Sequence, residues 1–172
     1  MEATELAVGD STRLEIIFST KRYRSRITKS PSIETNEGEP HKRVRIVADV
    51  LARPDSTFPI IIKPYKLDIS QFGEKVRDEM KFNITNVSEQ DLKVRLVYQP
   101  EGYFDLELPG TVKAGKTAQG VLKLRKEAID TSFDKSVTIE LDDESASRFT
   151  IPIKRKLRIP GQSSTAAASE SP

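Results

Sequence analysis

Apolar residues recur at every second position through most of the chain, and this alternation sets the fold class. Met80, Phe82 and Ile84, for example, alternate with polar neighbours. The same pattern occurs in segments 14–18, 92–98, 104–108, 137–141 and 149–153. Successive side chains of a β-strand point to opposite faces, so each segment predicts a strand with one buried face. Segment 125–131 is where we expect a helix, of about two turns at most.

Turn-forming residues separate these segments at intervals of about ten residues, which is typical of a sandwich or barrel. These turns are Asn86-Val87-Ser88, Pro100-Glu101-Gly102, Pro109-Gly110, Ala114-Gly115-Lys116 and Asp142-Asp143-Glu144. We therefore predict an all-β chain with an immunoglobulin-like antiparallel β-sandwich.

The chain also matches itself at an offset of about 106 residues, and the matches preserve strand phase. Segments 8–12 and 29–34 match 114–118 and 135–140, and after one residue of slippage 43–46 matches 148–151. A period near 100 residues is the size of an immunoglobulin-like sandwich. The repeat therefore predicts one complete copy preceded by a partial copy.

This reading divides the chain into four parts. Residues 1–52 form the C-terminal half of a first immunoglobulin-like domain, 53–57 the linker, 58–160 a complete domain and 161–172 a disordered tail rich in Ser and Ala. Half a sandwich leaves an apolar face and an unpaired edge. We expect that the chain is a piece of a longer tandem protein, or that the partial copy borrows a partner, including another copy through the exposed strand edge.

Composition narrows the classes of function. The chain has 28 Lys and Arg and 26 Asp and Glu. This near balance argues against a dedicated nucleic-acid-binding protein, which usually has a strong excess of basic residues. No apolar run reaches the length of about 20 residues that a membrane helix requires. The first residues lack the pattern of an export signal. With no cysteine, disulfides, thiolate metal sites and cysteine nucleophiles are excluded.

Several motifs resemble one known family. Segments 67–73, 82–86 and 91–94 are similar to its opening elements, a "dFG" motif followed by "F-x-[IF]-x-N" and "L-x-[IV]"; segments 104–106 and 112–115 are similar to its next strand and turn. In the first copy, segments 14–20, 23–24, 28–30 and 34–36 resemble its closing half. The chain thereby resembles the bacterial domain-of-unknown-function 1573 family, related to the ASH and major-sperm-protein type of immunoglobulin-like fold.

The resemblance implies a periplasmic or extracellular protein, tandem copies and no catalytic activity. Many family members carry a Cys-Gly-Cys element after the second strand, where this chain has Val97 to Pro100. A role that depends on those thiols is therefore not carried over. The residues themselves do not determine the localisation.

One segment matches the phosphate-binding loop G-x-x-x-x-G-K-[ST], from Gly110 to Thr117. That motif requires a helix after the lysine, whose N-terminal amides bind phosphate. The residues after Lys116 alternate as a strand does, and the first copy has Gly9-Asp10-Ser11 at the matching place. We interpret the glycine as a turn residue and expect no nucleotide or other cofactor.

Two further features have plain interpretations. His41, the single histidine, is expected in an exposed turn and lacks the neighbours of a catalytic base. Asp142-Asp143-Glu144 could hold calcium, but a solvated hairpin tip is the favoured interpretation. We therefore predict no catalytic and no metal-binding residues.

Basic residues cluster in one segment of the first copy and could contact an anion. These candidates are Lys21, Arg22, Arg24, Arg26 and Lys29. A second basic group, in segment 154–158, is interpreted as charge that protects an edge strand. The function expected is a non-catalytic module for binding a protein partner, still unidentified, or for structural spacing. The alternative is a polyanion-binding module that uses the basic patches.

Overall fold

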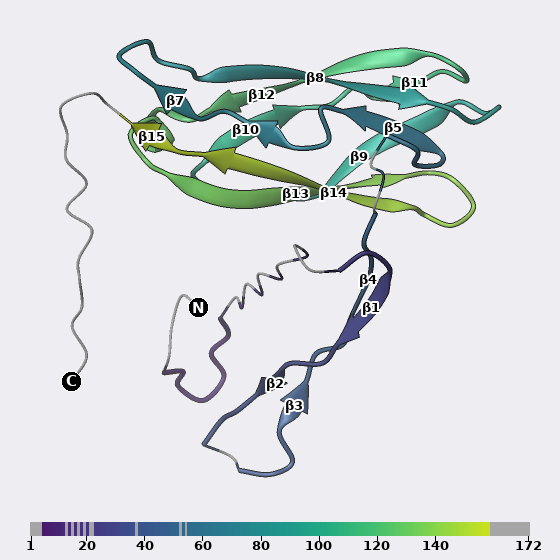
Figure 1. The fold of residues 1–172 in the computed structure, drawn as a ribbon. Helices are drawn as coiled ribbons and strands as arrows, with labels where there is room; N and C mark the ends of the chain where they lie inside the picture. The colour runs from purple at the N-terminus through teal and green to yellow at the C-terminus, as the bar shows by residue number, and fades with distance from the viewer. Residues whose placement is uncertain are drawn as a thin grey trace. The chain divides into compact units, whose positions relative to one another are not determined.

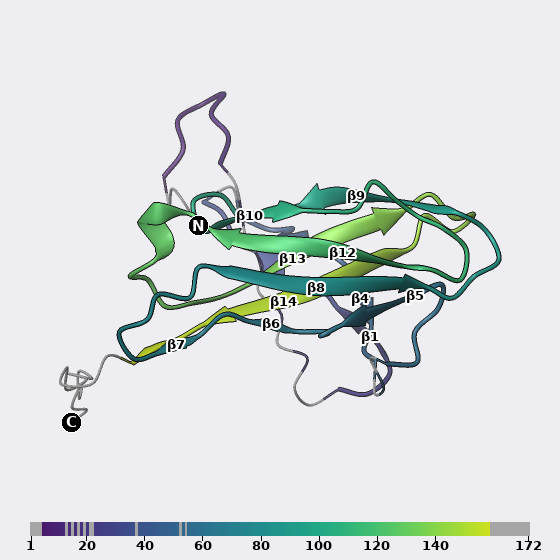
Figure 2. The ribbon, with the colours of Figure 1, turned by 90° about the horizontal axis from the view of Figure 1, so that it is seen from above.

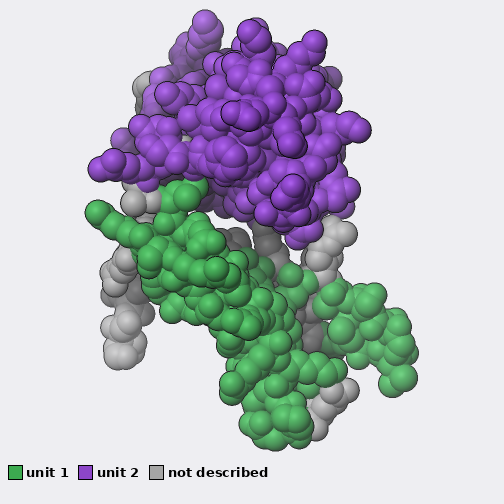
Figure 3. Space-filling model, turned by 90° about the vertical axis from the view of Figure 1, so that its right-hand side faces the viewer, with its two compact units in different colours: residues 1–52 green, residues 53–172 purple. Residues whose placement is uncertain are grey.

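The computed structural model describes residues 5–12, 14, 16, 18, 20, 23–36, 38–51, 53 and 55–158. The chain divides into two compact units, Met1–Ala52 and Arg53–Pro172 (Figure 3). Among the described residues, no helix is long and apolar enough to cross a membrane.

The second unit consists of two packed β-sheets (Figure 1). The four-stranded sheet has the order β10-β12-β8-β5, with β10 at Phe104–Glu107, β12 at Thr117–Leu124, β8 at Glu79–Asn86 and β5 at Ile60–Lys63. The five-stranded sheet has the order β11-β9-β13-β14-β6, with β11 at Thr111–Val112, β9 at Leu92–Tyr98, β13 at Phe133–Leu141, β14 at Arg148–Arg155 and β6 at Leu67–Asp68.

This strand order is that of an immunoglobulin-like sandwich. Lettered A to G along the chain, the main strands are β5, β8, β9, β10, β12, β13 and β14. Strands A, B, E and D then form one sheet and C, F and G the other, as in a constant-type immunoglobulin domain. The predicted all-β sandwich is therefore confirmed.

The opening strand changes sheets along its length. β5 pairs antiparallel with β8, whereas β6 pairs parallel with β14 on the opposite sheet (Figure 2). The chain then continues as β7 (Gln71–Phe72), which pairs parallel with β15 (Leu157–Arg158). One continuous segment thus borders both layers.

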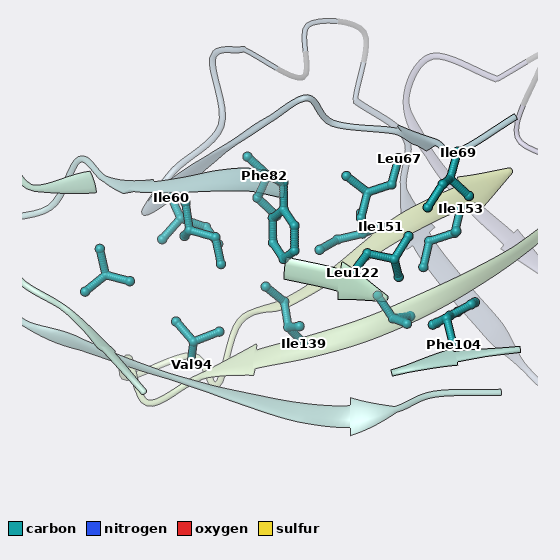
Figure 4. Close-up of a cluster of buried hydrophobic side chains, with 14 of the residues drawn as sticks. Ile60, Leu67, Ile69, Phe82, Val94, Phe104, Leu122, Ile139, Ile151 and Ile153 are labelled. Atoms are coloured by element: carbon teal, nitrogen blue, oxygen red, sulfur yellow. The ribbon is translucent and has the colours of Figure 1, made fainter. Parts of the chain in front are cut away.

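The core lies between the two sheets and contains most of the residues that the alternation placed there (Figure 4). Leu96 and Tyr98 are exceptions, because the alternation in 92–98 puts them on the buried face, whereas they are 40% and 39% exposed. Phe82 of β8 faces Ile139 and Ile151 of the other sheet across this layer. All of these side chains are almost completely buried. In segment 125–131 the helix is a single 3-10 turn, η1, at Lys126–Ala128.

The first unit is a long hairpin. β1 (Arg26–Lys29) pairs with β4 (Ile46–Asp49), and β2 (Ser32–Ile33) pairs with β3 (Lys42–Arg43), all antiparallel and in one continuous register. The repeat matches it to the β13–β14 hairpin. Lys29 pairs with Ile46, whereas the matching Lys135 pairs with Ile153, two residues beyond the match of Ile46. A shift of two residues keeps each side chain on its face.

The prediction of a strand at 14–18 is wrong for the residues that the structure describes in this segment. Leu14, Ile16 and Phe18 are not in a strand. Their matches Leu122 and Leu124 lie in β12, which pairs with both β8 and β10. The reason is that a strand needs a hydrogen-bonded neighbour, and the described part of the first unit provides only the hairpin.

No described residue of the first unit is buried. A two-stranded hairpin is at best marginally stable in water. That this unit is the second half of another sandwich stays a prediction.

Candidate binding surfaces

The basic residues expected to contact an anion are not all brought together. Lys21 and Arg22 lie outside the described residues, and Arg24 and Arg26 are exposed. Lys29 instead lies on the other face of the hairpin, with its Nζ 5.2 Å from the centre of the Tyr23 ring. Their role in anion binding stays a prediction.

The second strand of the hairpin supplies basic residues that the sequence analysis missed. Arg43 pairs with Ser32 in the register, and Arg45 follows two positions later. Because side chains alternate, Arg43 and Arg45 share a face with Arg26 and Thr28. We call the set formed by Arg26, Thr28, Ser30, Ser32, Arg43, Arg45, Val47 and Asp49 the arginine face.

Burial confirms this alternation. Every member of the arginine face is exposed, whereas Ile27, Ile33, Ile46 and Ala48 on the opposite face are half-buried. The hairpin is therefore amphipathic. Arg43 and Arg45 join the basic segment 24–29 only through the strand pairing of the hairpin.

On the outer face of the sandwich, Glu140 lies between two arginines. Its carboxylate accepts hydrogen bonds from the guanidinium of Arg95 on β9 and from Nε of Arg148 on β14, the latter at 2.6 Å. The two arginines are largely exposed, but they cover Glu140 so well that its side chain is only 3% exposed. Hydrogen bonds from Arg95 and then Arg148 lower the pKa of Glu140. The cluster holds three strands together and carries net positive charge.

The edge-strand interpretation of the second basic group is wrong for Lys154 and Arg155. These residues lie on β14, which is between β13 and β6, whereas Arg158 lies on β15, which pairs with β7 alone. Arg155 is 1% exposed and donates to the main-chain oxygens of Ile69, Arg77 and Ile129 and to Oε1 of Gln71. Burial lowers the pKa of this guanidinium. Its role is to fasten β6 and β7 to the loop after η1.

The segment that resembles a phosphate-binding loop is a turn followed by a strand. Gly115 has a φ of 64°, and the Lys116 amide donates to the Lys113 carbonyl at 3.0 Å. Thr117 begins β12, and its hydroxyl is 2.8 Å from that of Thr85. Without a helix after the lysine, no set of N-terminal amides faces a phosphate.

The acidic tip after β13 uses its carboxylates to hold the loop. Asp142 accepts the amide of Lys93 at 2.7 Å, and Asp143 accepts both the amide and the hydroxyl of Ser147. Among the described residues, no group of three or more His, Asp or Glu is arranged to hold a metal ion. His41 lies beside Glu39, with Nε2 3.0 Å from Oε1.

An apolar stretch lies at the edge of the five-stranded sheet. β11 pairs only with Leu92 and Lys93, so the rest of β9 extends beyond it. There Leu96, Val97 and Tyr98 are 40%, 43% and 39% exposed. A β-bulge at Val97 interrupts the register with β13.

No family model and no curated protein matches the chain. Among solved structures, a protein of unknown function from Porphyromonas gingivalis W83 is 16% identical, with a TM-score of 0.44, over 60% of this chain and 49% of its own. This chain thus spans about half of that structure. WR4, an MSP family member from C. elegans, is 15% identical with a TM-score of 0.39, over 58% of this chain and 98% of its own.

A Pseudomonas aeruginosa chaperone, CupB2, is 15% identical over 55% of each chain, with a TM-score of 0.35. The fold assignment rests on the strand order of the chain itself. Membership of the domain-of-unknown-function 1573 family stays a prediction.

Proposed function

We propose that the chain is a non-catalytic binding module whose second unit recognises a protein segment at the outer edge of β9. The observation that carries this proposal is the exposure of Leu96, Val97 and Tyr98 at a point where β9 extends beyond β11. An extended peptide can add to such an edge through main-chain hydrogen bonds, with exposed apolar side chains providing contact area.

The hydrogen bonds made by the polar side chains support a role without catalysis. Asp142 and Asp143 hold the tip of the β13–β14 hairpin, and Arg155 fastens β6 and β7. Asn86 is buried and donates to the carbonyls of Gln90 and Val112. These groups, which could otherwise do chemistry, are engaged in holding loops and strand ends. Export from the cell, tandem copies and a spacing role belong to the same proposal and rest on the family resemblance.

A peptide display experiment tests the proposal. Peptides selected on the purified protein should lose binding when Leu96→Asp and Val97→Asp are combined, because charge at the edge disfavours an apolar partner. Val87→Asp is the matched control, since Val87 is 42% exposed and lies in the turn after β8. Peptides that bind the double variant as well as the wild type would contradict the proposed surface.

A separate experiment tests the proposal that the chain is not a catalyst. Lys116→Ala should leave the protein's behaviour toward ATP unchanged, with no saturable binding in either form. Saturable turnover of ATP by the wild type, lost in this variant, would overturn the proposal.

A further inference from the structure

The arginine face of the first unit has a composition that matches a phosphate surface. Arg26 lies on β1, and Arg43 and Arg45 lie on and just after β3. Exposed Arg24 precedes Arg26 by two positions. Thr28, Ser30 and Ser32 lie between the arginines. Arginine binds phosphate oxygens in pairs, and Ser and Thr hydroxyls are common phosphate donors.

Basic residues are concentrated in two segments of the first unit. Segments 20–33 and 41–48 together contain eight Lys and Arg and no Asp or Glu. The near balance of 28 Lys and Arg against 26 Asp and Glu in the whole chain therefore hides a strong excess of basic residues in these two segments. Two acidic residues of the hairpin, Glu34 and Glu39, lie at its tip between β2 and β3. Asp49 is the acidic member of the arginine face itself.

We infer that the arginine face binds the phosphate backbone of duplex nucleic acid without reading its sequence. A duplex carries one negative charge per about 1.7 Å of its axis, the arrangement that a row of arginines neutralises most effectively. Along one strand, side chains on the same face recur about every 6.6 Å, so neighbouring arginines can reach different phosphates. A two-stranded ribbon is also narrow enough to follow a groove.

The composition of the arginine face argues against two other polyanions, single-stranded nucleic acid and an anionic membrane. Single strands are held by aromatic side chains that stack on bases, and the face has none. Tyr23 faces Lys29 instead. Binding to an anionic membrane is strengthened by apolar surface that inserts beside the charges, and Val47 is the single apolar member of the arginine face. This inference goes beyond the protein-binding role proposed for β9, because it concerns the other unit and another class of ligand.

Fluorescence anisotropy with a labelled duplex of about 20 base pairs tests the inference. If four arginines contact phosphates, the affinity should fall about 100-fold between 50 and 200 mM salt, since each contact contributes about 0.9 to the logarithmic slope. The triple variant Arg26→Gln, Arg43→Gln, Arg45→Gln should bind weakly and lose only about threefold over that range. A second duplex of unrelated sequence should bind equally well.

The matched control removes the same charge from the sandwich. Lys63→Gln, Lys81→Gln and Lys113→Gln replace three exposed lysines of the second unit, and this triple variant should bind as the wild type does. To separate loss of contact from loss of structure, hydrogen exchange is followed at Val44 and Val50, whose amides donate across the hairpin to Pro31 and Ser25. Their exchange rates should be unchanged in the arginine variant.

A second variant keeps the charge. Arg43→Lys with Arg45→Lys should retain the salt slope and weaken binding a few-fold, because an ammonium cannot form the paired bonds of a guanidinium. Three outcomes would overturn the inference: no duplex binding near 50 mM salt, equal binding by the arginine variant, or tighter binding of heparin or phosphatidylserine vesicles than of the duplex. None of these outcomes affects the test at β9.

Discussion

The ring of Phe82 lies directly over the backbone of Gly120, its partner in the β8–β12 register. A Cβ atom added at Gly120 would lie 2.3 Å from Cζ of Phe82. Both residues are buried, and the ring fills the space that a side chain on β12 would occupy.

Gly120→Ala is therefore expected to destabilise the second unit by about 1–3 kcal/mol, the usual cost of overpacking a core. Chemical denaturation of the wild type and the variant measures this loss of unfolding free energy. Gly110→Ala is the control, because an added Cβ meets nothing within 4 Å there. Equal stability of wild type and Gly120→Ala would show that the ring can move aside at no cost.

Asn86→Ala should destabilise the unit by about 2–4 kcal/mol. The buried amide donates to the Gln90 and Val112 carbonyls and accepts from Ser88, so its removal breaks these hydrogen bonds inside the protein. Asn83→Ala, three residues earlier on the same strand but exposed, should change the unfolding free energy by less than about 0.5 kcal/mol. Similar losses for the two variants would refute the assigned role.

Arg155→Met should cost about 3–5 kcal/mol, because it leaves several buried carbonyls unpaired. Arg155→Lys keeps the charge but offers one nitrogen in place of three, so it should recover only part of this loss. The amides of Ile69 and Gln71, which donate to Lys154 and Lys156, should exchange faster in both variants. Arg158→Met, at an exposed position, is the control. Unchanged exchange at Ile69 would contradict the fastening role.

The pairing of Glu140 predicts a dependence of stability on pH. The folded-state pKa is lowered below the ordinary value of 4.5, so the carboxylate contributes stability that is fully present above pH 4.5. This contribution disappears as the pH falls through the lower, folded-state pKa. The difference in unfolding free energy between wild type and Glu140→Gln should therefore shrink between pH 6 and pH 3. A constant difference over that range would contradict the prediction.

Much of the second unit could be predicted from its sequence, because alternation is a local signal. The alternation of apolar and polar residues alone predicted that Phe82, Ile84 and Ile139 lie in the core, and all three are buried in the structure. The turn at Gly115 followed from the strand pattern after Lys116. The segment 14–18 shows the limit, since the pattern specifies a face to bury but not a neighbour to pair with.

The charged clusters were harder to predict because they depend on pairing between distant segments. Glu140 meets Arg95 across 45 positions, and Arg155 meets Ile69 across 86. No local pattern distinguishes Arg155, which is buried, from Arg158, which is exposed. Arg43 and Arg45 were likewise missed because their place beside the other arginines depends on the hairpin register.

The change of sheets by the opening strand has a mechanical consequence. Because β6 and β7 run parallel to β14 and β15, tension between the two ends of the second unit pulls these neighbours lengthwise past each other. The amides of Ile69, Gln71 and Gly73 all bond to this closing segment, so their bonds would share the load and break together. Antiparallel terminal strands would instead open one bond at a time. Pulling on the ends of this segment therefore loads these three hydrogen bonds in shear.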